Sequence, residues 1–272
     1  MYESTKSFNS IKSFKDLDEG SPKKRRTSEV KFLRNTPKND ELYRPMILKS
    51  QEALAKVAEI NSSDYSKDFE KIYEEKEEEH KLKIYLSSYT TPEKHRVNKV
   101  RAEFYVPVTP AQFLKFMGDV SEQWAIDDGT LENLYPIAVL NDESEQSHIV
   151  YYLSHKKQMI ASARDFVYIR TVKKLDEDTY ADSSVSVDYP GFPATNDRTR
   201  CELKAEGHLV KLVSGKDGEK PLSLVRMCSE SDFKITMPLF MAKKLTQASV
   251  QSSVERCIQR LKELYPESTS TK

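Results

Sequence analysis

The sequence predicts an α+β fold, in which a curved antiparallel sheet wraps around a long C-terminal helix. Apolar residues over 237–265 recur at gaps of three, four and seven, the period of a helix with one buried stripe. Over 81–233 the pattern changes to the two-residue alternation of strands, with connections mostly too short for parallel crossovers. About 28 helical residues span roughly 40 Å, so this helix needs a broad apolar partner such as the sheet.

Composition and charge exclude several classes of function. Lys plus Arg and Asp plus Glu both number 43, so the net charge is zero and predicts no general attraction to nucleic acid. No Gly-rich phosphate loop occurs, and no cofactor is expected. Cys201, Cys228 and Cys257 are widely spaced within apolar patterns, which indicates reduced core thiols rather than disulfides or metal ligands. No apolar run suits a signal peptide or membrane span, so we expect a soluble, cytoplasmic monomer with peripheral membrane contact.

The chain divides into a tail, one domain and a short end segment. Residues 1–44 are predicted to be a disordered basic tail, because so polar a segment cannot bury enough apolar surface to offset ordering. Residues 45–266 form the domain, and 267–272 a disordered C-terminus. In the tail, basic residues directly precede Thr27 and Ser28, which suits a basophilic kinase or a nuclear-import signal. A solvated basic tail is the alternative.

The domain is expected to begin with helices. Residues 45–59 carry apolar side chains at helical spacing and predict a short amphipathic helix. A second helical segment is predicted from about Ser66 through the glutamate run. Consecutive carboxylates over 74–79 point in different directions around a helix, so they indicate a solvated face rather than a metal site.

Strands then dominate as far as the last helix. Alternating apolar residues predict a hairpin of strands over 81–88 and 100–106. Thr109 and Pro110 form a favourable helix start, with Thr as N-cap and Pro at the first position. Gly207 interrupts a later strand and predicts a bulge or bend. The remaining predicted strands are 134–140, 148–155, 164–172, 179–189, 199–213 and 222–233.

One segment resembles a known family. Residues 154–170 read Ser-His-Lys-Lys-Gln-Met-Ile-Ala-Ser-Ala-Arg-Asp-Phe-Val-Tyr-Ile-Arg. They closely resemble the central signature of START (steroidogenic-acute-regulatory-related lipid transfer) domains, a Ser/Pro-x-Arg-Asp-Phe/Tyr-Val-x-x-Arg strand followed by a strand ending in Ser-Val, as in 183–187. The resemblance covers about 46–265, and its other matching positions are Trp124, 199–202, Asp232 and 237–239.

The resemblance implies a helix-grip fold, in which the curved sheet clasps the C-terminal helix and encloses an apolar cavity for one lipid. It implies non-enzymatic binding and intermembrane transfer, or sensing, of a single phospholipid or sterol. An enzyme on the same fold, such as a cyclase or thioesterase, and a phospho-regulated signalling adaptor are the alternatives. An enzyme would need an acid–base pair in the cavity, whereas His148, His155 and His208 look isolated on their strands.

Two headgroup patterns of the family are incomplete here. Members that carry phosphatidylcholine have an arginine just before the tryptophan, but Ser-Glu-Gln precedes Trp124. Tyr152 and Phe166 do fall at two positions of the aromatic cage that binds choline. In sterol carriers a buried acidic residue pairs with the arginine that aligns with Arg170, and tyrosines stand near that acidic position here. The lipid therefore stays open between phospholipid and sterol.

One strand carries three of the nine residues that we predict to contact a ligand. If 164–172 is a regular strand, Phe166, Tyr168 and Arg170 share one face and the apolar residues between them share the other. Arg170 either holds a ligand phosphate or carbonyl, or pairs with a neighbouring carboxylate.

Six further residues complete the predicted site. Phe192, at the apolar tip of 188–193, suits a lid that dips into a membrane surface, and a packed loop is the alternative. Leu203 is placed inside by hydrophobic alternation, whereas the resemblance suggests the opposite phase of its strand. The other members are Trp124, Tyr152, Phe240 and Met241. Core packing is the alternative for the first two of these, and the last two begin the C-terminal helix, at the end that we expect to move.

Overall fold

The computed structural model describes residues 41, 43–64, 67–75, 80–127, 129–141, 147–157, 162–215 and 220–266. The predicted tail sites Thr27 and Ser28, most of the glutamate run and the C-terminal segment 267–272 lie outside the described residues. No helix among the described residues is long and apolar enough to cross a membrane.

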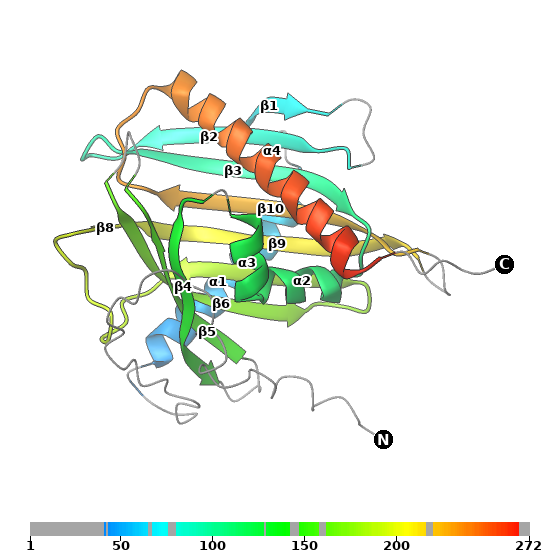
Figure 1. The fold of residues 1–272 in the computed structure, drawn as a ribbon, viewed down its shortest axis with the longest axis horizontal. Helices are drawn as coiled ribbons and strands as arrows, with labels where there is room; N and C mark the ends of the chain where they lie inside the picture. The colour runs from blue at the N-terminus through cyan, green and yellow to red at the C-terminus, as the bar shows by residue number, and fades with distance from the viewer. Residues whose placement is uncertain are drawn as a thin grey trace. The chain divides into compact units, whose positions relative to one another are not determined.

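A single large sheet organises the described part of the domain (Figure 1). Its strands follow the order β1-β2-β3-β10-β9-β7-β6-β5-β4, every neighbouring pair is antiparallel, and β8 adds a short parallel pairing to β6. The strands are β1 (Glu70–Glu74), β2 (Lys83–Thr90), β3 (Arg96–Val106), β4 (Leu131–Asn141), β5 (Ser147–His155), β6 (Arg164–Lys174), β7 (Thr179–Ser186), β8 (Thr199–Arg200), β9 (Glu202–Ser214) and β10 (Leu222–Asp232). The helices are α1 (Arg44–Ser62), α2 (Pro110–Gly118), α3 (Val120–Ile126) and α4 (Leu239–Leu264). The predicted α+β fold is confirmed.

Helices cover the two faces of the sheet differently. On the face that we call outer, α1 lies over β6, β7 and β9, where Met46 and Ala53 pack with Val167, Ile169 and Val185. The other face, which we call inner, carries α2, α3 and α4 (Figure 1). Residues therefore alternate between two different apolar layers along the central strands, and both faces of those strands are buried.

The Thr109 helix start is confirmed in detail. The Thr109 hydroxyl accepts a hydrogen bond from the Gln112 N–H, and the Gln112 side chain accepts one from the Thr109 N–H at 2.8 Å. This reciprocal capping box satisfies backbone donors that the first turn of a helix leaves free. It fixes the start of α2 directly after β3, so that Phe113 and Phe116 enter the inner core.

The helix predicted from Ser66 through the glutamates is wrong at its start, where the chain forms the edge strand β1. Glu70 and Lys71 pair with β2, while Ile72 and Tyr73 pack against the inner core. Backbone pairing with β2 and burial beneath α4 outweigh the local helical preference of a glutamate-rich sequence.

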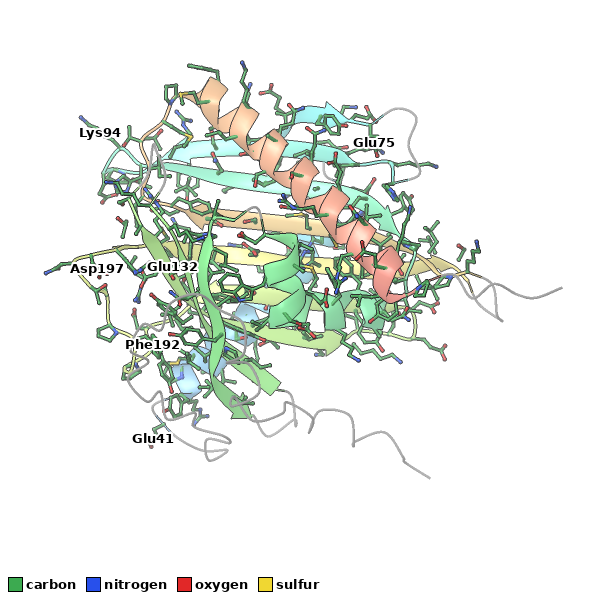
Figure 2. All side chains as sticks on the ribbon, viewed as in Figure 1. Glu41, Glu75, Lys94, Glu132, Phe192 and Asp197 are labelled. Atoms are coloured by element: carbon green, nitrogen blue, oxygen red, sulfur yellow. The ribbon has the colours of Figure 1, made fainter. Side chains whose placement is uncertain are left out.

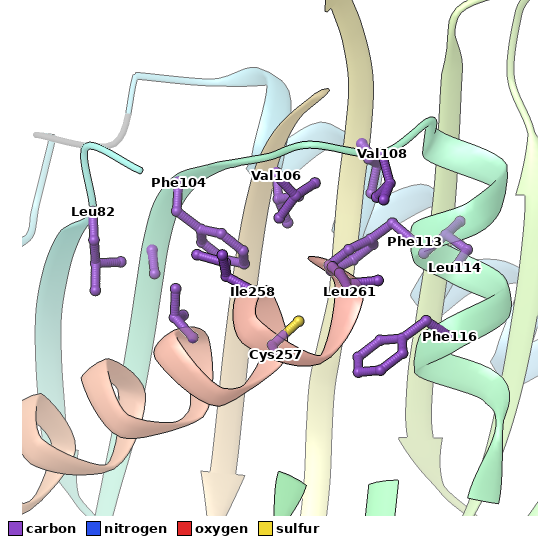
Figure 3. Packing of buried hydrophobic residues seen from close by; sticks show 14 of the residues in the cluster. Leu82, Phe104, Val106, Val108, Phe113, Leu114, Phe116, Cys257, Ile258 and Leu261 are labelled. Atoms are coloured by element: carbon purple, nitrogen blue, oxygen red, sulfur yellow. The ribbon is translucent and has the colours of Figure 1, made fainter. Parts of the chain in front are cut away.

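The long C-terminal helix is anchored by its second half. Val254, Cys257, Ile258 and Leu261 are buried with β2, β3, β10 and α2. Figure 3 shows the last three of these pointing towards the aromatic side chains of β3 and α2. In the first half Ala242 is buried, whereas Leu239, Leu245 and Phe240 are exposed, Phe240 by 63%. The apolar stripe of α4 is thus packed at one end and accessible at the other.

The register shift of β9 nearest to Gly207 lies three residues before the predicted place. Gly207 pairs regularly with Ser183 of β7 and Cys228 of β10, whereas the register shifts between Leu203 and Ala205. The glycine is required for another reason, since a Cβ atom there would lie 2.1 Å from the Asp182 carbonyl oxygen and 2.9 Å from Val57 of α1. The outer layer can approach the sheet closely because this position has no side chain.

The three cysteines are free and buried, as expected. Burial raises the pKa of Cys257 to about 12, and the pKa values of Cys201 and Cys228 also rise to about 12, chiefly because of burial. Their thiols stay protonated and behave as small apolar side chains.

Candidate functional site

A cavity of about 240 Å³ lies on the inner face, between the central strands and the α2–α3 region. Its apolar wall consists of Met117, Leu134, Leu153, Phe166, Leu203 and Phe233. Its polar wall consists of Gln123, His155, Tyr168, Arg170, Asp182, Ser184, Glu206 and His208, with Gly207 contributing backbone. An apolar enclosure with a few converging polar groups is the usual form of a small-molecule site.

A buried ion pair dominates the polar wall. Arg170 of β6 donates to Asp182 of β7 through Nε at 3.0 Å and through Nη2 at 2.7 Å. The same Nη2 atom donates to the carbonyl of Leu114 in α2 at 3.2 Å. A Cβ atom on Gly118 would lie 2.5 Å from Nη1, so the end of α2 leaves room for the guanidinium only because that residue is glycine. Arg170 therefore ties α2 to the sheet.

Asp182 also binds His208 from the opposite neighbouring strand, β9. Its Oδ1 atom accepts from the His208 backbone N–H at 2.8 Å and bonds to Nδ1 of the ring at 2.9 Å. Burial alone would raise the pKa of Asp182, but His208 and Arg170 outweigh this effect and hold the pKa well below its ordinary value. Asp182 is therefore a carboxylate with both oxygens engaged.

Glu206 is the second carboxyl group in the cavity, and its environment acts in the opposite direction. Burial raises its pKa, and the nearby Asp182 raises it further, although His208 and a hydrogen bond from Ser229 act to lower it. The Ser229 hydroxyl donates to Oε2 at 3.2 Å. The two acidic side chains thus have pKa values pushed apart by their surroundings, an arrangement that is common at functional sites.

Four of the nine predicted residues come together at the cavity, namely Phe166, Tyr168, Arg170 and Leu203. The first three share the inner face of β6, as the alternation predicts. Leu203 reaches the same wall as Glu206 because of the irregular register between them. Hydrophobic alternation correctly places Leu203 on the cavity side. The opposite phase, which the resemblance suggests, applies from Glu206 onward. Whether these residues contact a ligand stays a prediction.

Tyr152 and Phe192 lie elsewhere, on the outer layer. Their ring centroids are 5.2 Å apart, and Tyr135 and Tyr189 belong to the same aromatic cluster beside α1. Figure 2 shows Phe192 near α1 and away from α4. The Phe192 carbonyl accepts a hydrogen bond from Arg200 at 3.2 Å. Phe192 is half-buried in this cluster on the face that α1 covers, which favours the packed-loop alternative, and its role as a lid stays a prediction.

The remaining three predicted residues are at the surface. Trp124 is 43% exposed on α3, while its neighbour Gln123 lines the cavity. It is thus neither a core residue nor a cavity residue. Phe240 is exposed and Met241 half-buried on the first turn of α4, and neither lines the cavity. None of the residues of the short helix α3 is buried, Trp124 included.

Asp182, Glu206, His208 and Phe233 are cavity residues that sequence reasoning did not select. Alternation on β7 predicts that the face with Ala181 and Val185 is buried. Both faces of the strand are in fact buried, and the polar face with Asp182 and Ser184 lines the cavity. The buried acidic partner of Arg170 also exists, but it comes from β7 rather than from the strand where sterol carriers have it. The sequence signal that could have identified Asp182 is the alternation of polar and apolar residues along the central strand β7. Among the described residues, no group of three or more His, Cys, Asp or Glu is placed to hold a metal ion.

One family model matches most of the domain. A family model described as "START domain" matches residues 71–266. The ceramide transfer proteins of Mus musculus and Homo sapiens are each 28% identical to this chain over 111 residues, which make up 39% of this chain but 17% of the relative. The match thus spans less than a fifth of these curated relatives.

Solved structures show the same fold at low sequence identity. Human StAR-related lipid transfer protein 5 superposes with a TM-score of 0.61 at 14% identity, covering 82% of this chain and 99% of that one. Human STARD10 gives 0.56 at 14% identity, covering 85% and 84%. At 14% identity, these structures show that the fold is shared and nothing about the ligand.

Proposed function

Because this chain belongs to the START domain family, we propose that it binds one lipid in the inner-face cavity and transfers it between membranes, or senses it, without chemical conversion. The resemblance of residues 154–170 to that family is confirmed by the family match. The observation that carries the proposal is the cavity itself, whose apolar wall would shield lipid chains from water.

The size of the cavity implies movement. At about 240 Å³ it is smaller than the roughly 300–1,000 Å³ of typical ligand pockets. A lipid therefore enters only if a wall moves outward. Phe233 both lines the cavity and is exposed, and it lies six residues before the start of α4. The first half of α4 and the segment before it bury little apolar surface. They are therefore the parts that can move outward at the lowest cost in free energy.

The first half of α4 also suits contact with a membrane surface. Leu239, Phe240 and Leu245 are exposed there, close in sequence to Lys243 and Lys244. Exposed apolar side chains beside lysines are typical of helices that lie in the interface of an anionic bilayer. We propose that this end of α4 meets the donor or acceptor membrane.

The His208–Asp182 contact favours one alternative, an enzyme on the same fold. It is an acid–base pair in the cavity, the feature that such an enzyme needs. However, Asp182 is shared with Arg170, and the cavity hydroxyl of Ser184 stands opposite Glu206 rather than His208. Incubation with lipid esters, followed by mass spectrometry of the products, tests this alternative, and we expect the esters to remain intact.

Native mass spectrometry and vesicle extraction test the main proposal. We expect the purified protein to carry one lipid and to remove lipid from vesicles at a one-to-one ratio. Leu203→Trp should fill the cavity and reduce extraction, whereas Val213→Trp, at an exposed position of the same strand, should leave it unchanged. If the wild-type protein neither carries nor extracts any lipid, the proposal is wrong.

Regulation and assembly remain proposals. A kinase acting at Thr27 or Ser28 would place negative charge in the basic tail and weaken its attraction to anionic surfaces. Vesicle binding by Thr27→Glu/Ser28→Glu, compared with the double alanine variant, tests this effect. A sedimentation experiment tests the expectation of a monomer.

A further inference from the structure

The main cation of the cavity is already engaged. The Arg170 guanidinium donates twice to Asp182 and once to the Leu114 carbonyl, and its Nη1 atom abuts Gly118. The side chain of Arg170 is 11% exposed and that of Asp182 is 4% exposed, so water does not screen the pair. A lipid phosphate would have to compete with Asp182 for this cation, and breaking a buried pair is costly.

Glu206 places a further carboxyl group where a phosphate would have to sit. Like Asp182, it lines the cavity, and the two belong to adjacent strands. An ionised phosphate oxygen only accepts hydrogen bonds, so it gains none from a neighbouring ionised carboxylate such as that of Asp182 and is repelled by it. The electrostatics of this wall therefore disfavour an anionic headgroup.

A row of polar side chains crosses this part of the sheet, and the Ser184 hydroxyl and the Glu206 carboxyl group within it line the cavity. Ser184 stands opposite Arg170 on one side and opposite Glu206 on the other, and Glu206 stands opposite Ser229. These four residues thus form one row across β6, β7, β9 and β10. A carboxyl group has several acceptor sites and, when protonated, one donor, so the Ser229 hydrogen bond does not exhaust the capacity of Glu206.

We propose that Glu206 and Ser184 form the headgroup site for an uncharged, hydroxyl-bearing lipid, and that Arg170 holds α2 against the sheet instead of binding a lipid phosphate. This inference rests on the proposed lipid-binding function and narrows its ligand class. A lipid hydroxyl both donates and accepts, so it complements a carboxyl group and a serine hydroxyl in either protonation state of Glu206. The apolar wall of Phe166 and Leu203 would then contact the lipid chains.

A matched pair of lipids tests this assignment in the intact chain. The probes are a fluorescent diacylglycerol and the phosphatidic acid with the same acyl chains, offered in otherwise identical phosphatidylcholine vesicles. They differ only in whether the headgroup is a hydroxyl or a phosphate. We expect wild-type protein to extract diacylglycerol at least about tenfold better, the equivalent of one good hydrogen bond. Equal or preferred extraction of phosphatidic acid would overturn the proposal.

Substitutions then assign the effect to residues. Glu206→Leu and Ser184→Ala should each lower diacylglycerol extraction several-fold, and Glu206→Gln should retain most of it because an amide both donates and accepts. Glu230→Gln on β10, a partly exposed glutamate bonded to Tyr89, is the matched control and should have no effect. If Glu206→Leu does not fold, Ser184→Ala and the two-lipid comparison still decide the outcome.

Three further outcomes distinguish the possible failures. Extraction of diacylglycerol that is indifferent to both Glu206 and Ser184 overturns this inference and leaves the proposed lipid binding intact. A wild-type preference for a long-chain amine over diacylglycerol would identify Glu206 as a cation site, which also overturns it. Failure of wild-type protein to extract any of the probes, or any vesicle lipid, contradicts the proposed function itself.

Discussion

Asp182 accepts two hydrogen bonds from the guanidinium of Arg170, at 3.0 and 2.7 Å, although the two residues are diagonal neighbours rather than register partners. The diagonal contact leaves Oδ1 of Asp182 for His208 on the other adjacent strand. One carboxylate thus links three strands, and through Arg170 it also reaches α2. The position of α2, which forms one side of the cavity, depends on this contact.

Removing the charge of Asp182 should destabilise the fold strongly. Asp182→Asn leaves a buried Arg170 without its anionic partner, for which a loss of about 3–5 kcal/mol is expected. Denaturant unfolding followed by circular dichroism measures the effect. Asp197→Asn, which removes a largely exposed carboxylate beside Arg198, is the control and should change little. Similar stabilities of the two variants would contradict a structural role for the pair.

The contribution of Asp182 should disappear in acid. Its pKa is lowered in the folded state, so its stabilisation is complete above its unfolded-state pKa of about 3.9 and is lost as the pH falls below that value. The difference in unfolding free energy between wild type and Asp182→Asn should therefore be constant from pH 7 to 5 and shrink below about pH 4. A difference that stays constant down to pH 2.5 would argue against a depressed pKa.

Glu206 should show the opposite dependence. Its pKa is raised in the folded state chiefly by burial, so its charged form is disfavoured and stability is lost as the pH rises above its unfolded-state pKa of about 4.3. The unfolding free energy of Glu206→Gln relative to wild type should accordingly increase between pH 4 and pH 8. Paired titrations of the two proteins measure this, and a decrease over that range would exclude the effect.

Tethering the first half of α4 should block lipid transfer. Lys243 of α4 pairs with Glu70 of β1 at 2.6 Å, and Arg260 in the second half pairs with Glu122 of α3 at 2.6 Å. A bismaleimide joining Cys residues at 70 and 243 should reduce vesicle-to-vesicle transfer at least about tenfold, while a tether at 122 and 260 should not, because that half is already packed. The native thiols are buried with raised pKa values and should not react. Equal inhibition by both tethers would refute opening at the first half.

Two phenylalanines should separate membrane contact from fold stability. Phe240→Asp should weaken vesicle binding without lowering stability, because Phe240 is mostly exposed. Phe192→Asp should instead lower the free energy of unfolding by more than about 1 kcal/mol, because it puts a charge among Tyr135, Tyr152 and Tyr189. Vesicle sedimentation and denaturant unfolding measure both variants. The reverse pattern would restore Phe192 as the membrane-dipping residue.

Local periodicity was enough to predict most of the strands, the long C-terminal helix and one wall of the site. The helical spacing over 237–265 predicts α4, and the two-residue alternation over 164–172 places Phe166, Tyr168 and Arg170 on one face. These inferences hold because the periods of helix and strand are properties of the backbone, which each segment expresses by itself. The match of 154–170 to a known family then supplied the fold.

Only the tertiary structure decided which face of each strand meets the cavity and which meets α1. Tyr152 lies on the outer layer and Asp182 on the cavity wall, although nothing within either strand distinguishes its two faces once both are buried. The shifted register between Leu203 and Glu206 likewise depends on pairing with β10, a strand that follows later in the chain. The local sequence determines only whether a side chain points to the same face of the strand as its neighbours. Which layer that face contacts depends on strand pairing and helix packing between segments that are distant in the sequence.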